Sequence, residues 1–265
     1  MRSQTVSTFT LVMLAALLLA GISFAGCSTA QGDGKTLFIT GTYGAINRGV
    51  YDGSVTVADL KRHGDFALGT FNGIDGELVG LNGKYYQIGS QGKINPADDN
   101  WNTPYSTVTF FKPDKVISID KPLGYQELQS YLNSQLPTTN IFYAMKVTGK
   151  FDSIKARSLT KLNKPYPATP YSIITQNEPT FEFNNIEGTL VVIVSPAYTG
   201  ELSYPGYHAH FISSDGKYGG HVIDCRITSG QAEVASLPNF TVNLPQSSEF
   251  YKTDFTKSYT VSQGH

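Results

Sequence analysis

The sequence is poor in the residues that mark several classes of protein. It has only two cysteines in 265 residues, too few for the disulfide framework of a small secreted domain. Its 20 basic and 21 acidic residues give a formal net charge of −1, which argues against nucleic acid or another polyanion as a partner. Long helical periodicities are few, whereas aromatic residues, glycine and proline are plentiful. This composition predicts a sheet-rich globular protein.

An apolar run near the N-terminus is too short for a comfortable membrane span. It extends from Leu11 to Ile22, after Arg2, and small residues follow it up to Cys27. This order of charge, apolar run and small residues is typical of an export signal. Residues 1–27 are therefore predicted to be a leader, and the mature protein is expected to be exported.

The end of this leader allows two kinds of processing. The string Phe24-Ala25-Gly26-Cys27 resembles a bacterial lipoprotein cleavage box, in which the cysteine is lipidated and becomes the first residue. The alternative is a signal peptidase site after Ala25, with Ser23 at position −3. A lipid on Cys27 would be the one membrane contact and would leave Cys225 without a disulfide partner. We expect Cys225 to be a buried structural thiol.

Proline and glycine also divide the chain. Residues 28–35 form a short glycine-rich tether. The string KPYPATP, residues 164–170, has three prolines in seven residues and cannot form regular structure, so a domain boundary is placed there. The prediction is an α+β, β-rich protein of two domains, each built on a large mixed or antiparallel sheet. The N-terminal domain covers 36–163, and the C-terminal domain covers 164–265.

Local signals predict several regular elements in the first half of the chain. A capping box and apolar residues three and four apart indicate helices, and alternating apolar residues indicate a strand. Asp-Gly and Asn-Gly dipeptides indicate two-residue hairpin turns of type I′. The elements expected are a strand over 36–44, helices over 56–64 and 122–136, and turns at Asp75-Gly76 and Asn82-Gly83.

Three of the five histidines fall in one stretch, residues 206–224, which reads GYHAHFISSDGKYGGHVID. His208 and His210 are two apart in a predicted strand and therefore point to the same face. Asp215-Gly216 predicts a type I′ turn, which needs positive φ at both central positions. A two-residue loop there brings His210 opposite His221, with His208 diagonally across on the same face. The sequence thus predicts that three imidazoles converge through local structure alone.

Three converging imidazoles are typical of a catalytic metal site, which has three protein ligands and one or more open positions. The alternatives are a polar hairpin face that binds no ion and a cupin-like oxygenase site. A cupin usually carries a carboxylate a few residues after its second histidine, whereas Asp215 here is needed by the turn. We therefore favour a metal site with His208, His210 and His221 as ligands.

Three parts of the sequence resemble the α-acetolactate decarboxylase family. They are HGDFALGTFNGIDGEL (63–78), Arg157 with the downstream KPYP, and PGYHAHFISSDGKYGGHV (205–222). The resemblance covers about residues 36–254. It implies a lyase that uses zinc, or another divalent transition metal, to convert 2-acetolactate to (R)-acetoin and carbon dioxide in acetoin biosynthesis. It also implies two α+β domains with large sheets, often assembled as a homodimer.

The family's functional residues fall on matching positions of this sequence. Its metal-binding histidines correspond to the three hairpin histidines, its active-site glutamate to Glu77, its arginine to Arg157 and a substrate-binding threonine to Thr70. One departure concerns a further glutamate that the family usually carries near its C-terminus. Residues 256–265 contain no carboxylate side chain, and Gln263 lies about where that glutamate is expected. Its absence would shift proton delivery toward Glu77 or reduce the activity.

The implied reaction needs a group that accepts the electrons left when carbon dioxide departs. A divalent ion that chelates the ketone and hydroxyl oxygens polarises the carbonyl and stabilises the resulting enediolate. Glu77, kept protonated in a dry pocket, is the candidate acid that protonates the enediolate. Arg157 offers a fork for a carboxylate or enediolate oxygen. The competing hypothesis is a non-catalytic envelope lipoprotein that binds a metal or another ligand on the same fold.

Overall fold

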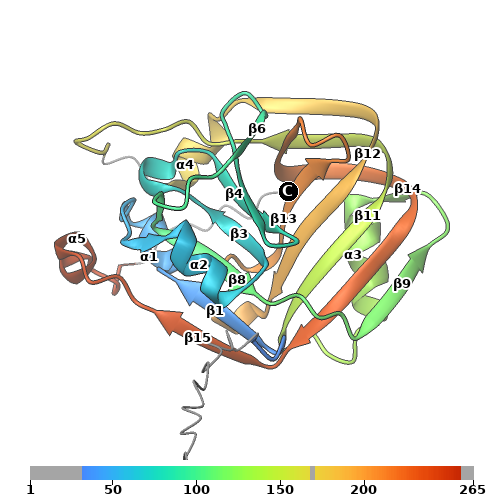
Figure 1. Ribbon diagram of the computed structural model, residues 1–265, viewed down its shortest axis with the longest axis horizontal. Helices are drawn as coiled ribbons and strands as arrows, with labels where there is room; N and C mark the ends of the chain where they lie inside the picture. The colour runs from blue at the N-terminus through green and yellow to red at the C-terminus, as the bar shows by residue number, and fades with distance from the viewer. Residues whose placement is uncertain (1–31, 168–170, 258–265) are drawn as a thin grey trace, which may run out of the picture. The chain divides into compact units, whose positions relative to one another are not determined.

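A computed structural model describes residues 32–167 and 171–257 of the chain, and two β-sheets dominate it (Figure 1). The predicted leader, its Cys27 and the C-terminal Gln263 lie outside the described residues. Within them, no helix has the length and apolar character needed to cross a membrane.

The first sheet is mixed and has seven strands. Its order is β15-β1-β8-β3-β4-β5-β6, and β15 runs parallel to β1 while the other neighbours are antiparallel. The strands are β1 (Thr36–Thr40), β3 (Phe66–Thr70), β4 (Glu77–Leu81), β5 (Lys84–Ile88), β6 (Ile94–Pro96), β8 (Tyr105–Thr109) and β15 (Asn239–Asn243).

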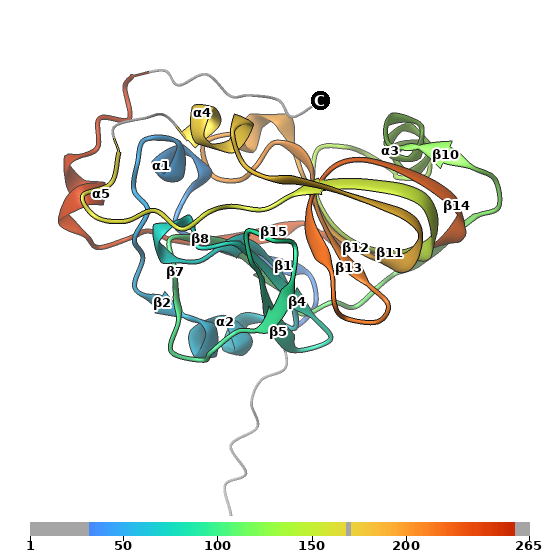
Figure 2. The ribbon, with the colours of Figure 1, turned by 90° about the horizontal axis from the view of Figure 1, so that it is seen from above.

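The second sheet is antiparallel and has six strands. Its order is β10-β14-β11-β12-β13, with β9 also paired to β14. Because β13 pairs with β14 as well as with β12, four strands close on one another, and Figure 2 shows this curled sheet beside the first. The strands are β9 (Lys115–Ile119), β10 (Leu123–Gly124), β11 (Phe142–Arg157), β12 (Thr180–Ser195), β13 (Gly206–Ser213) and β14 (Gly219–Leu237).

The remaining elements are short. A two-stranded ribbon and several helices lie around the sheets, and Figure 2 shows α3 beside β14. They are β2 (Val55–Thr56), β7 (Asn102–Thr103), α1 (Tyr43–Asn47), α2 (Val57–His63), α3 (Tyr125–Ser134), α4 (Tyr171–Gln176), α5 (Ser248–Lys252) and the 3₁₀ helices η1 (Asn72–Ile74) and η2 (Ala197–Thr199).

Apolar side chains of the two sheets share one core. Leu37 and Val79 of the first sheet cluster with Ile193 and Leu237 of the second, and all four are fully buried. Burying one such side chain contributes about 1.5–3 kcal/mol to folding. This shared core packs the first sheet, through β3, against the strands that carry the histidines.

The predicted β-rich α+β class, with one mixed and one antiparallel sheet, is confirmed. Both sheets take strands from each side of residue 164, since β11 belongs to the second sheet and β15 to the first. No helix or strand occurs over residues 164–167, the described part of the proline-rich segment predicted to be irregular. The division into domains at residue 164 stays a prediction.

Both predicted helices are present, whereas the first strand is shorter than expected. Helix α2 has the predicted capping box, in which the Thr56 hydroxyl accepts from Asp59 N and the Asp59 carboxylate accepts from Thr56 N, each at 3.0 Å. The strand predicted over 36–44 ends at Thr40. Gly41 then adopts a φ of 69°, and Thr42 caps the new helix α1.

The two predicted turns of the first sheet have different outcomes. Asn82 and Gly83 both have positive φ, 52° and 76°, so the type I′ turn between β4 and β5 is confirmed. The type I′ turn at Asp75-Gly76 is wrong, because Asp75 has a φ of −77° and only Gly76 is positive. A longer connection containing η1 joins β3 to β4 instead.

Cys225 is a free, buried cysteine on β14, as predicted. Burial raises the pKa of its thiol to about 12, with the charge of Asp224 acting in the same direction. A thiol that stays protonated at neutral pH is a poor nucleophile and a poor metal ligand.

Candidate metal centre

The β13–β14 hairpin brings the three histidines together. His210 lies opposite His221, in the register that the sequence predicts. One ring nitrogen from each of these residues and one from His208 all lie within 4.8 Å of one another, and the three side chains are buried. The predicted convergence is therefore present.

The turn of this hairpin differs from the predicted type I′ turn. Gly216 has positive φ, at 69°, but Asp215 is not among the described residues with positive φ. Gly216 N donates to the Ser213 carbonyl and Ser213 N donates to the Tyr218 carbonyl, each at 2.9 Å, so the loop has four residues. The Asp215 carboxylate accepts from the Ser213 hydroxyl at 2.7 Å and ties the turn together. The register survives because adding one residue on each side keeps the same pairs opposite.

All three imidazoles are held neutral. Burial lowers the pKa of His208 to about 3 and lowers the pKa values of His210 and His221 well below the ordinary value; the charge of Arg157 acts in the same direction. His210 Nδ1 lies 3.2 Å from the Leu78 carbonyl oxygen, which can only accept, so Nδ1 carries the proton and Nε2 presents a lone pair. Three neutral nitrogen donors, one already oriented, fit a divalent transition metal.

A buried carboxyl group faces the histidines. Glu77 begins β4, and its Oε2 lies 3.4 Å from His210 Nε2 while its Oε1 lies 3.8 Å from Arg157 Nη1. Within the described chain, neither that Oε1 nor that Nη1 has a hydrogen-bond partner. Burial raises the pKa of the Glu77 carboxyl to about 7, against the opposing charge of Arg157. A carboxylic acid with this pKa can donate a proton near neutral pH.

Arg157 reaches the histidines from the last position of β11. It pairs with His221 across β11 and β14, so the sheet register brings its side chain beside the cluster. The side chain is 14% exposed. Buried groups of this kind usually have hydrogen-bond partners, and a guanidinium nitrogen without a hydrogen bond on a residue that lines a cavity is suited to bind an oxygen of a ligand.

Thr70 lies opposite Glu77 in the pairing of β3 with β4. Its buried hydroxyl donates to the Gly76 carbonyl at 2.6 Å. This bond closes the connection that leads into β4, so Thr70 helps to place Glu77 as well as lining the site.

Two cavities meet at the centre. The inner one has a volume of about 20 Å³ and is lined by Thr70, Glu77, Arg157, His208 and His221, among others. The outer one has a volume of about 820 Å³, and Arg157 and His221 line it as well. The inner cavity is about the size of one water molecule. The outer cavity is large enough for a small organic substrate.

Sequence reasoning did not single out four tyrosines that line the inner cavity: Tyr43, Tyr105, Tyr171 and Tyr204. The Tyr204 ring stacks on His208 with centroids 4.9 Å apart, and Tyr43 meets Tyr204 edge-on at 5.2 Å. Tyr204 lies shortly before the strand that carries His208 and His210, so its position in the sequence could have indicated that it lies near the site. Tyr43 lies in the segment predicted as a strand and carries no local signal.

Neutral imidazoles, a carboxylic acid and a guanidinium at the inner end of a cavity define a metalloenzyme-type centre on a β-rich, two-sheet fold. Residues 37–257 match the family model described as Alpha-acetolactate decarboxylase. The chain is 41% identical over 218 residues to the alpha-acetolactate decarboxylase of Methanosarcina mazei, covering 82% of this chain and 75% of that protein. It is 33% identical over 233 residues to that of Bacillus subtilis, covering 86% and 91%.

The fold gives the same result. The crystal structure of alpha-acetolactate decarboxylase from Bacillus subtilis strain 168 superposes with a TM-score of 0.81 at 32% identity, covering 84% of this chain and 94% of that one. The chain belongs to the alpha-acetolactate decarboxylase family, whose members are carbon–carbon lyases.

The buried titratable groups predict that the metal-free protein loses stability as the pH falls below 6.5. Between about pH 5 and 6 the unfolded chain has its three histidines largely protonated and Glu77 largely ionised, whereas the folded chain keeps the imidazoles neutral and Glu77 protonated. The unfolded state then binds about two more protons, so the free energy of unfolding should fall by roughly 2–3 kcal/mol per pH unit of acidification. Urea unfolding of chelated protein at pH 6.0 and 5.0 measures this slope.

The variant His221→Gln is the control for this prediction. It removes one of the three histidine protons, so the slope should drop by about 1.4 kcal/mol per pH unit. An equal slope in this variant and in the parent protein would show that the buried imidazoles do not set the acid sensitivity.

Proposed function

We propose that this protein decarboxylates 2-acetolactate to (R)-acetoin and carbon dioxide, with zinc held by His208, His210 and His221. The observation that carries the proposal is the position of Glu77. Its buried carboxyl group, with a pKa of about 7, lies between His210 and Arg157 at the inner cavity. The family membership supports the choice of reaction.

The three imidazoles would hold the ion, and no charged ligand would reduce its positive charge. A bound divalent ion supplies a Lewis acid for the carbonyl oxygen that takes up charge as carbon dioxide leaves. Zinc suits a centre of three histidines, and another divalent transition metal can use the same donors. The Leu78 carbonyl keeps His210 in the tautomer that directs Nε2 inward.

Arg157 is the group that binds and orients the substrate anion. Its unpaired Nη1 faces Glu77 at 3.8 Å, and its side chain lines both cavities, so it can donate to an oxygen of a molecule that extends from one into the other. A fixed guanidinium that contacts an oxygen which gains charge as the carboxylate departs stabilises the transition state more than the ground state.

Glu77 is the proton donor. Loss of carbon dioxide leaves an enediolate carbon that must gain one proton, and the neutral Glu77 carboxyl group holds one at the inner cavity. Because Glu77 comes from one side, from β4, it protonates one face of the planar enediolate and yields one enantiomer. Solvent reached through the outer cavity then restores its proton. The Thr70 hydroxyl already donates to Gly76, and its lone pairs can accept from the substrate hydroxyl.

The test is release of (R)-acetoin from racemic 2-acetolactate by the purified protein, with added zinc and again after chelation. Zinc-dependent formation of one enantiomer is the expected result. A folded, zinc-loaded protein that forms no acetoin would contradict the proposal and favour binding without catalysis.

We also propose that the protein is exported and that Cys27 carries a lipid. The apolar run and the Phe24–Cys27 string support this proposal. Mass spectrometry of the protein from its native envelope should find a lipidated N-terminus at Cys27, and Cys27→Ala should abolish the lipid. An N-terminus at Gly26 would instead support cleavage after Ala25 by an ordinary signal peptidase.

A further inference from the structure

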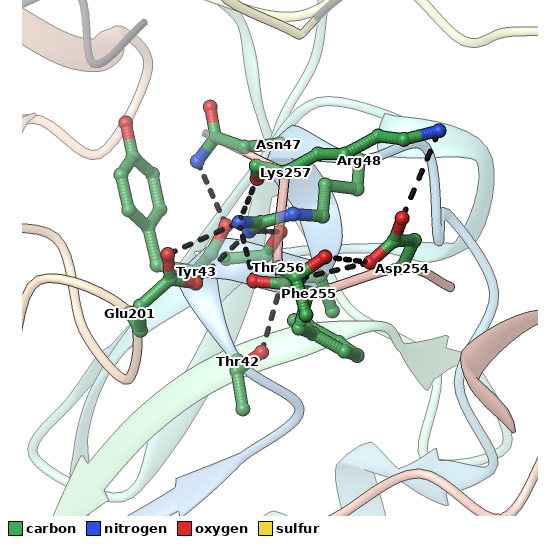
Figure 3. A network of polar contacts seen from close by, with 11 residues as sticks. Thr42, Tyr43, Asn47, Arg48, Glu201, Asp254, Phe255, Thr256 and Lys257 are labelled. Carbon is green, nitrogen blue, oxygen red and sulfur yellow. Dashed lines mark hydrogen bonds and ion pairs between the residues drawn. The ribbon is translucent and has the colours of Figure 1, made fainter. Parts of the chain in front are cut away.

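We propose that Arg48 is a positioning residue for this reaction. It lies at the end of α1, outside both cavities, and we infer that it orients two tyrosines of the inner cavity, Tyr43 and Tyr204. Arg48 and its partners Gly44, Glu201, Phe255 and Lys257 are called the Arg48 clamp below (Figure 3). The kinetic part of the inference rests on the proposed function, and the structural part does not.

One guanidinium group joins three segments of the chain in the Arg48 clamp. Nη1 donates to the Gly44 carbonyl and to Glu201 Oε2, each at 2.9 Å, and Nη2 donates to Glu201 Oε1 at 3.2 Å. Nη2 also donates to the Lys257 carbonyl at 2.7 Å, and the guanidinium carbon lies 5.2 Å from the centre of the Phe255 ring. Figure 3 shows Glu201, Phe255 and Lys257 converging on Arg48. A planar fork can serve all of them at once, whereas a lysine ammonium cannot.

Backbone bonds couple α1 to the loop that carries Glu201. Tyr43 N donates to the Leu202 carbonyl at 3.2 Å, and Gly44 N donates to the Glu201 carbonyl at 2.9 Å. These are first-turn N–H groups, which have no partner within a helix. The side-chain and backbone bonds together make α1 and residues 200–204 one unit.

This unit forms the wall of the inner cavity next to the histidines. The Tyr43 and Tyr204 rings meet edge-on, and Tyr204 stacks on His208 at 4.9 Å and lies 5.8 Å from His221. Tyr43 and Tyr204 line both the inner and the outer cavity. A shift of α1 or of the loop would therefore move the surface against which the substrate is held.

The ion pair of the Arg48 clamp is placed to fix geometry more than to add stability. The Glu201 side chain is 58% exposed while that of Arg48 is 10% exposed, and a pair with one partner in solvent contributes little to folding. Its two parallel hydrogen bonds nevertheless fix the orientation of the Glu201 carboxylate relative to the Arg48 guanidinium.

Gly44 provides a second way to disturb the clamp. A Cβ atom at this position would lie 1.9 Å from Glu201 Oε2, so the carboxylate approaches Arg48 only because residue 44 has no side chain. The clashing atom is the end of a flexible side chain. The Cβ atom would also lie 3.1 Å from Arg48 Nη1, a tight contact that a shift of a few tenths of an ångström relieves. Gly44→Ala should therefore displace mainly the carboxylate and break its bonds to the guanidinium.

The experiment compares Arg48→Gln, Arg48→Lys and Gly44→Ala with a matched control. The control is Arg62→Gln, because Arg62 is an exposed arginine on α2 that pairs with Asp59. Zinc-loaded proteins are assayed for kcat and KM with 2-acetolactate. Hydrogen–deuterium exchange is followed by mass spectrometry in peptides that cover residues 41–48, 199–206 and, as an internal reference, β11.

The clamp predicts faster exchange over 41–48 and 199–206 in Arg48→Gln and Gly44→Ala, with unchanged exchange in β11 and unchanged zinc content. It predicts a fall of about tenfold or more in kcat/KM for both variants, because a small misplacement of a positioning group costs one to two powers of ten. Arg48→Lys should be intermediate, since it keeps the charge but loses the fork. Arg62→Gln should match the parent protein in every measurement.

Two results would overturn the inference. One is unchanged exchange over 41–48 and 199–206 in both disrupting variants. The other is faster exchange with kcat/KM within twofold of the parent protein, which would make the clamp purely structural. If Arg48→Gln fails to fold, Gly44→Ala alone decides. A parent protein that forms no acetoin would contradict the proposed function separately, and the exchange data would still decide whether Arg48 orders the two tyrosine segments.

Discussion

Replacing His210 with alanine is expected to abolish zinc binding and to lower kcat/KM by at least about 10³-fold. Its Nε2 lies 3.1 Å from His208 Nε2 and 3.4 Å from Glu77, and its Nδ1 is held by the Leu78 carbonyl. Removing it leaves two nitrogen donors and takes away the one whose orientation a backbone carbonyl sets. Metal analysis of the purified variant and its acetoin release measure both effects.

His63→Ala is the control for this prediction. His63 stacks on Phe38 at a centroid distance of 3.7 Å and belongs to α2, outside the cluster of ring nitrogens. The His63→Ala variant should bind zinc and release acetoin as the parent protein does. Full zinc stoichiometry in His210→Ala would contradict the ligand assignment.

Glu77→Gln is expected to keep the metal and to lower kcat by about 10²–10⁴-fold, the usual contribution of a general acid. The amide matches the carboxylic acid in size and remains uncharged beside Arg157, so the fold and the histidines should be undisturbed. It has no proton that it can release to carbon. Zinc content, kcat and the enantiomer of residual acetoin are the quantities to measure.

Glu187→Gln is the matched control, because Glu187 is exposed and pairs only loosely with Lys150, at 3.4 Å. It should turn over as the parent protein does. Normal turnover by Glu77→Gln would show that another group is the acid. The next candidate is then Glu178, which lines the outer cavity and whose charge raises the pKa of Glu77.

The convergence of the histidines could be predicted because it depends on neighbours along the chain. A side-chain period of two places His208 and His210 on one face, and a short turn returns the chain so that His221 faces His210. The exact turn type did not matter, since the loop gained one residue on each side and kept the register. Helices α2 and α3 were predictable for the same reason, because their caps and apolar spacing are local.

The site residues outside the hairpin could be predicted only through resemblance to the family. Glu77 follows a turn and Arg157 ends a strand, and neither pattern separates them from ordinary surface residues. Leu78, whose carbonyl orients His210, is 132 residues away in sequence and contributes no side-chain signal. The roles of Tyr43 and Arg48 could not be predicted from the sequence. The segment 36–44 has the alternation of a strand, but the chain forms a helix after Gly41.

The sequence by itself determined the hairpin, its three imidazoles and their capacity to bind a metal, because hydrogen bonding and side-chain direction within one hairpin are decided over a few residues. Only the tertiary structure decided that a glutamate from the first sheet and an arginine from β11 would meet those imidazoles in a nearly dry cavity. It also decided the charge states. Burial makes the histidines neutral and Glu77 a weak acid, and burial depends on how two sheets pack together.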